Sequence, residues 1–252
     1  MKNRAIAAGI LVCAGTAALA GGVERSSQSV AILFEEGRYV ELSFGRFSPD
    51  ISGTRAGASS GDIALGYNTV SLGYKMDLGD RINLAVIIDQ PIGADVSYPG
   101  GTGYLLQGST AELTSSAITA LLRYKFENNV SVYGGLRHQT VKGVASLPVL
   151  GPYTLTSNND AELGYVVGVA WEKPEIAARV ALTYNSAITH TLDSVEFGGI
   201  PGNFETEVPQ SVNLEFQTGV AKDTLVFGSI RWVEWSAFEI DQFTVKLGHQ
   251  AV

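Results

Sequence analysis

The sequence predicts an all-β fold, a transmembrane antiparallel up-and-down β-barrel, from three observations. Apolar and polar residues alternate with a period of two in segment after segment, which gives each strand two chemically different faces. Short turns near positions 79, 128, 174 and 222 are separated by long connections. A signal-like segment precedes the strands. Together these features are typical of an outer-membrane barrel, which is apolar outside and polar inside.

Residues 1–20 indicate a signal peptide. A basic start is followed by an apolar run at residues 5–17 and by a small-x-small cleavage site at residues 18–20. The run is shorter than the ~20 residues of a membrane-spanning helix, and Val12 before Cys13 is too large for a lipidation site. We therefore expect cleavage after Ala20 and a mature chain without cysteine, which excludes disulfides and thiol catalysis.

Ten strand-like segments follow a short stretch at residues 21–37, which we expect to be a plug remnant, and make residues 38–252 the barrel region. In one of them Val212, Leu214 and Phe216 point to one face and polar residues to the other. The expected strands lie at residues 39–46, 69–76, 81–89, 118–126, 130–141, 162–172, 178–185, 211–217, 224–235 and 238–247.

The polar face repeatedly carries charged residues in the middle of a strand. A soluble β-sandwich also shows alternation, but it needs neither these inward charges nor the regular rhythm of short turns and long loops. Such charges could select solutes, although they more often pair across the interior to hold the barrel and its plug. The residues concerned are Glu41, Lys75, Arg81, Asp89, Arg123, Arg137, Glu162, Arg179, Glu215 and Arg231.

Composition narrows the possible functions. Removal of the signal leaves 15 basic residues against 25 acidic ones, a net charge of about −10, which disfavours nucleic acid as a partner. His138, His190 and His249 are far apart and suggest no catalytic triad. Residues 100–103 form no phosphate-binding loop, and no metal-ligand spacing appears. We therefore expect neither an enzyme nor a cofactor or metal.

Three stretches resemble the FadL/TodX family of outer-membrane hydrophobic-compound transporters. Residues 88–94 (IDQPIGA) resemble its strand-ending Pro-Phe-Gly element, with Ile92 in place of the phenylalanine. Residues 179–190 resemble its Gly-Leu-Ser-Tyr-Arg-Ser segment, and residues 232–238 (WVEWSAF) resemble its W-x-x-W-S-x-F pattern. The order and spacing of these stretches span about residues 38 to 240.

The resemblance implies a barrel of roughly fourteen strands, plugged by an N-terminal hatch, in the bacterial outer membrane. Hydrophobic molecules such as long-chain fatty acids would enter between external loops and leave sideways through a gap near a kinked strand. The family's long hatch with its Asn-Pro-Ala element is missing, and no terminal aromatic residue is present. About ten strands fit this length, which favours a truncated rather than a smaller closed barrel.

The expected binding site consists of apolar residues on a Gly-rich external loop, Tyr98, Tyr104, Leu105 and Leu106, with Phe34 contributed by the plug. Packing of loop on loop is an equally good explanation of these side chains. Arg137 or Arg179 would supply the counter-charge for a fatty-acid carboxylate.

Pro91 and Gly93 are expected to break strand pairing, and the resemblance places the lateral exit there. The expected partners are hydrophobic small molecules and outer-membrane lipid, for a monomeric passive transporter. The alternative is a structural or adhesive barrel that transports nothing.

Overall fold

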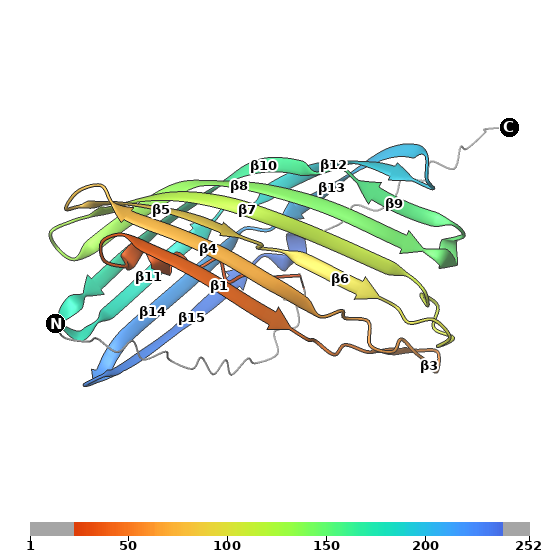
Figure 1. The fold of residues 1–252 in the computed structure, drawn as a ribbon, viewed down its shortest axis with the longest axis horizontal. Coiled ribbons are helices and arrows are strands. Elements are labelled where there is room, and N and C mark those ends of the chain that lie inside the picture. The colour runs from red at the N-terminus through yellow and green to blue at the C-terminus, as the bar shows by residue number, and fades with distance from the viewer. Residues whose placement is uncertain (1–22, 239–252) are drawn as a thin grey trace.

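The computed structural model describes residues 23–238, which form a curled antiparallel sheet of thirteen strands and a separate two-stranded ribbon (Figure 1). The short turns gather at one end of the sheet and the long connections at the other. The signal peptide and the tenth strand expected from the sequence lie outside the described residues, except for Phe238. No helix of residues 23–238 is long and apolar enough to cross a membrane.

The strands are β1 (Tyr39–Phe47), β2 (Thr54–Arg55), β3 (Ala58–Ser59), β4 (Tyr67–Asp77), β5 (Ile82–Asp89), β6 (Gly93–Ser97), β7 (Thr110–Lys125), β8 (Val130–Leu147), β9 (Tyr153–Ser157), β10 (Asp160–Lys173), β11 (Ala178–Asn185), β12 (Ile188–Glu196), β13 (Ile200–Val208), β14 (Ser211–Ala221) and β15 (Thr224–Val233). Four short 3-10 helices are η1 (Ala31–Phe34), η2 (Pro148–Leu150), η3 (Pro174–Ile176) and η4 (Trp235–Ala237).

Nine strands form the continuous path of the sheet, in the order β1-β4-β5-β7-β8-β10-β11-β14-β15. Every neighbouring pair on this path is antiparallel and follows chain order, so the predicted up-and-down topology is confirmed. Within residues 23–238, β1 pairs only with β4, and β15 pairs only with β14.

The two faces of the sheet reverse the usual distribution of polarity. On the outer face Leu42, Leu136 and Leu163 are 70%, 59% and 63% exposed. On the inner face Lys75 and Gln139 are fully buried. A water-soluble protein buries its apolar face instead, so this distribution suits a wall whose outside meets lipid.

The long connections contain more regular structure than the sequence predicted. Residues 188–208 form the hairpin of β12 and β13, and residues 153–157 form β9, where only loops were expected. In β12 Ile188 and Leu192 are buried and pack with Val141 of β8. This packing stabilises a strand that lies outside the main path. The ninth expected strand is shorter than predicted, because a 3-10 helix begins at Trp235.

The N-terminal segment lies inside the curled sheet, with η1 in the half near the short turns (Figure 1). Its helix η1 buries Ile32 and Leu33 against Leu121 and Tyr133 on the inner wall. Gly168 lies directly opposite Tyr133 on β10, and a Cβ at that position would overlap the tyrosine ring. A glycine therefore makes room for the aromatic ring that packs against η1.

Candidate functional site

The N-terminal segment, residues 23–34, crosses the polar inner face of the sheet. Arg25 Nη2 donates to Asp95 Oδ2 at 2.7 Å, and Ser26 Oγ donates to Asp89 Oδ2 at 2.5 Å. A charge buried without such a partner would be costly. The interior charges and the segment therefore hold one another in place. Three further contacts reach the opposite wall: Glu24 with Arg231, Ser29 with Glu215, and Gln28 with Arg137.

The wall itself is interrupted between β5 and β6. β5 ends at Asp89 and β6 begins at Gly93, and the residues between them outnumber those opposite on β7 by one, which defines a β-bulge. Ser115 Oγ accepts from the Ile92 N–H at 3.0 Å and donates to the Ile92 carbonyl at 2.6 Å. Pro91, which has no N–H to offer, lies inside this bulge.

The interruption also separates β5 from its other neighbour, β4. Pairing between these strands ends at Leu72 and Ile88, although β4 begins five residues earlier, at Tyr67. Residues 67–71 of β4 pair with β1 alone among the described strands. The ladder is therefore discontinuous on both sides of residues 90–92.

The pairing of β4 stops before residues 91–93, and the N-terminal segment covers the strand edge at these residues. The Gly93 N–H donates to the Val23 carbonyl at 2.8 Å, and the Arg25 N–H donates to the Pro91 carbonyl at 3.0 Å. An antiparallel bridge between Glu24 and residue 92 completes this contact. Residues 23–25 thus take the place in the ladder that a neighbouring strand would otherwise hold.

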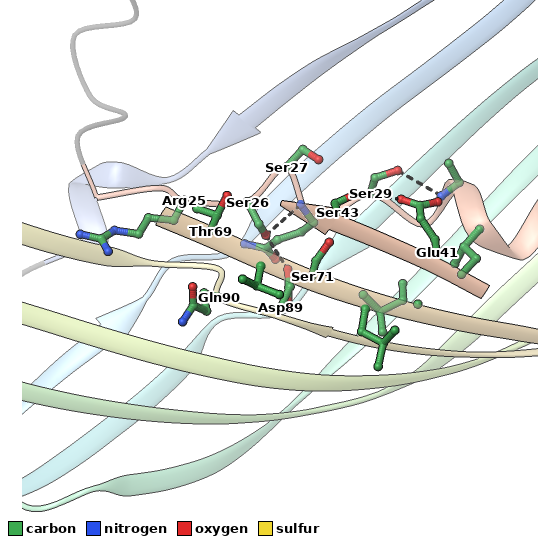
Figure 2. Close-up of a pocket in the computed structure, with 17 residues that line it drawn as sticks. Arg25, Ser26, Ser27, Ser29, Glu41, Ser43, Thr69, Ser71, Asp89 and Gln90 are labelled. Atoms are coloured by element: carbon green, nitrogen blue, oxygen red, sulfur yellow. Dashed lines mark hydrogen bonds between the residues drawn. The ribbon is translucent and has the colours of Figure 1, made fainter. Parts of the chain in front are cut away.

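A cavity of about 260 Å³ lies beside the interruption, between the N-terminal segment and the inner faces of β1, β4 and β5. Figure 2 shows the polar side chains that line it, from both the segment and the wall. The figure labels Arg25, Ser26, Ser27, Ser29, Glu41, Ser43, Thr69, Ser71, Asp89 and Gln90, and Gln28 lines the cavity as well.

Phe34 belongs to a different place, at the end with the short turns. Its ring lies near two guanidinium groups, with Arg123 Cζ 4.5 Å and Arg179 Cζ 4.6 Å from the ring centroid. Tyr133 packs edge-on against Phe34, with 5.9 Å between centroids, and Arg123 also pairs with Glu172. A second, wider cavity of about 850 Å³ opens beside this group and is lined by Phe34 and both arginines.

The predicted loop residues lie at the end with the long connections. The rings of Tyr98 and Tyr104 stack with 5.6 Å between centroids and 8° between planes. Leu105 is 55% exposed, and Leu106 is half-buried. The structure therefore brings the two tyrosines together and leaves Leu105 open to solvent.

Arg137 is in neither of these places. It is buried on the inner face of β8, where its Nε donates to Thr119 Oγ1 at 3.0 Å and its Nη1 donates to Gln28. The nine residues singled out in the sequence are thus distributed among the loop of Tyr98 and Tyr104, the wall interruption, the group around Phe34 and the contact of Arg137 with Gln28. They do not form a single site.

Arg25, Asp95 and Ser115 are structurally central here, and the sequence reasoning missed them. The sequence feature that pointed to them was the polar run at residues 24–29, which can form hydrogen bonds and ion pairs with the charged inner face. Among residues 23–238 no group of three His, Cys, Asp or Glu side chains could hold a metal ion.

Solved structures share this fold. A FadL homologue from Pseudomonas aeruginosa matches with a TM-score of 0.61 and 14% identity, over 82% of this chain and 62% of that one. A mutant of the TodX monoaromatic hydrocarbon channel matches at 0.61 and 14%, over 83% and 64%. The toluene transporter TbuX from Ralstonia pickettii matches at 0.57 and 14%, over 80% and 64%.

The chain spans less than two thirds of the length of each of these structures. No protein-family model matches the sequence, and no curated protein matches it either. At 14% identity, the likeness establishes the fold, a β-barrel like that of the FadL homologue.

Proposed function

We propose that the chain is an outer-membrane protein through which hydrophobic small molecules pass by diffusion. The interrupted wall is the observation that carries this proposal, because it lies beside a cavity in a sheet whose outer face is apolar. A hydrophobic molecule gains free energy by leaving water for lipid, so an opening in the wall serves it better than an aqueous pore does. Two of the similar structures are a hydrocarbon channel and a toluene transporter, which supports this class of solute.

Capture would take place at the external loop. Tyr98 and Tyr104 offer stacked apolar faces with polar tips, and Leu105 offers an exposed apolar side chain on a Gly-rich segment. Leu106, half-buried beside them, would extend this surface. An apolar group exposed on a loop is available to a ligand at no cost in protein packing.

Release would take place sideways at Pro91 and Gly93. The N-terminal segment, as the plug, would have to leave the edge at residues 91–93 before a ligand could pass between β4 and β6. The backbone bonds at residues 91–93 and the side-chain contacts of Glu24, Arg25 and Ser26 would break there, while the pairing between the strands of the sheet would stay intact.

Long-chain fatty acids are one candidate solute. Phe34 and Arg179 line the wider cavity, where the guanidinium offers a fatty-acid carboxylate a counter-charge. Arg137 would become available to such a group only after Gln28 leaves it. We expect a monomer, surrounded by outer-membrane lipid.

The test is a titration of the purified protein in detergent with a fluorescent fatty acid, followed by uptake of the same probe into cells that produce the protein. Leu105→Asp/Leu106→Asp should weaken binding at least tenfold, because a charge replaces the apolar contact. Leu150→Asp is the matched control, since Leu150 is a similarly exposed leucine (60%) at the same end of the sheet, on η2.

Unchanged affinity in the double variant would remove the loop from the proposal. Absence of both binding and uptake in the wild type would favour a structural or adhesive barrel instead.

A further inference from the structure

The cavity beside the wall interruption has a lining unlike that of a site for a pure hydrocarbon. Thr69 and Ser71 of β4 and Gln90 after β5 face it, and their side chains form no hydrogen bond with any other described residue (Figure 2). Ser43 of β1 has a single contact, a long one of 3.4 Å to Glu41. These groups are free to bond a ligand, whereas a hydrocarbon would deprive them of water without replacing it.

One side of the same cavity is apolar. Ile32 of η1 and Ile87 of β5 both point into the interior and belong to the lining. A cavity of 150 Å³ is already large enough for benzene, so about 260 Å³ accommodates one or two fused rings. The shape and lining therefore suit a compact molecule with an apolar body and one hydrogen-bonding end.

The charges around the cavity disfavour an anion. Two acidic side chains, Glu41 and Asp89, line it. Arg25 is the lining's single cation, and it is already engaged by Asp95 at 2.7 Å and by the ring of Tyr67 at 4.1 Å. An incoming carboxylate would meet the exposed Glu41 and the buried Asp89, and the lining itself would offer it no unengaged cation, so repulsion is screened by water on the Glu41 side only.

We propose that this cavity binds small neutral molecules that join an apolar body to a hydroxyl or similar uncharged group, and that it rejects carboxylates. The inference narrows the solute class of the proposed function, and it relies on that function only for the route by which the cavity is reached. It separates this cavity from the wider one beside Arg179, where an anionic end has a cation to meet.

The experiment compares three probes with the same ring system, naphthol, naphthoate and naphthalene, titrated at neutral pH into the full chain in detergent. Naphthol should bind at least about tenfold more tightly than naphthoate. Thr69→Val/Ser71→Ala should weaken naphthol binding about threefold to tenfold, the range expected for lost hydrogen bonds, and should leave naphthalene unchanged. Thr156→Val is the matched control, a hydroxyl removed from an exposed position on β9, away from the cavity.

A second variant guards against simple misfolding. Glu41→Gln removes one repelling charge from an exposed position on β1, so naphthoate binding should strengthen, and damage to the fold does not produce a gain of affinity. Equal affinity for naphthol and naphthoate, or no binding of naphthol, would overturn the proposal. The proposal would also be overturned if Thr69→Val/Ser71→Ala kept the wild-type preference for naphthol over naphthalene. Failure of probe uptake with naphthol selectivity retained would count against the transport function alone.

Discussion

Replacing Leu214 with arginine tests whether the outer face of the sheet meets lipid. Leu214 lies on the outer face of β14, between Leu182 of β11 and Ile230 of β15, which are 46% and 63% exposed. An arginine at this position points away from the interior carboxylates. In hydrocarbon its charge has no partner unless the side chain reaches the lipid headgroups.

The magnitude follows from the place of Leu214 along the strand. β14 has eleven residues, and a rise of about 3.3 Å per residue at a tilt of about 40° gives a height of about 25 Å, the thickness of a barrel's apolar band. Leu214 is two residues from the central Phe216, about 5 Å from the middle. An outward-facing arginine costs about 2–4 kcal/mol at the bilayer midplane and about 0–1 kcal/mol at the interface. At the intermediate depth of Leu214, we expect the substitution to lower the free energy of unfolding by about 2 kcal/mol.

Ser229→Arg is the matched control. Ser229 precedes Ile230 on β15 and lies opposite Glu215, on the inner face at nearly the same depth. An arginine there has both water and a carboxylate, so it should cost less than about 0.5 kcal/mol. Urea titration of folding into phospholipid vesicles, followed by tryptophan fluorescence, measures both changes. Equal losses for the two variants, or a negligible loss for Leu214→Arg, would refute the assignment of the faces.

Two further predictions concern the wall interruption. In Gly93→Val the new side chain would collide with the Arg25 side chain, whose Nε, Cδ and Cζ lie 2.5–2.7 Å from a Cβ at this position, so trypsin should cleave after Arg25 faster than in the wild type. Gly79→Val, where a Cβ meets nothing within 4 Å, is the control, and an equal cleavage rate in the two variants would contradict the prediction. Ser115→Ala should lower the free energy of unfolding by about 1–3 kcal/mol, because it leaves the buried Ile92 N–H and carbonyl without their partner. An unchanged urea midpoint would show that water replaces the hydroxyl.

Strand identity and strand faces could be predicted because both depend on local chemistry. The alternation of Val212, Leu214 and Phe216 with polar residues specifies one apolar and one polar face whatever the neighbours are. Pro91, with Gly93 two residues later, likewise indicates a break in pairing from the residues alone. The hairpin of β12 and β13 was missed because it is stabilised by packing against Val141, a contact that no local pattern displays.

The candidate site depended on tertiary structure almost entirely. Ser29 and Glu215 are 186 residues apart, and Arg25 and Asp95 are 70 apart, so their pairing depends on the curl and register of the sheet. For the same reason the sequence grouped Phe34 with Tyr98, although they lie at opposite ends.

By itself, the sequence determined that each strand would have one polar and one apolar face. Neighbouring residues of a strand point to opposite faces, so the alternation of polar and apolar residues is enough to define both. Only the tertiary structure decided which residues of the N-terminal segment cover the wall interruption and which charges lie beside it. Those properties belong to pairs and groups of residues, and the pairs form when the sheet curls around the N-terminal segment.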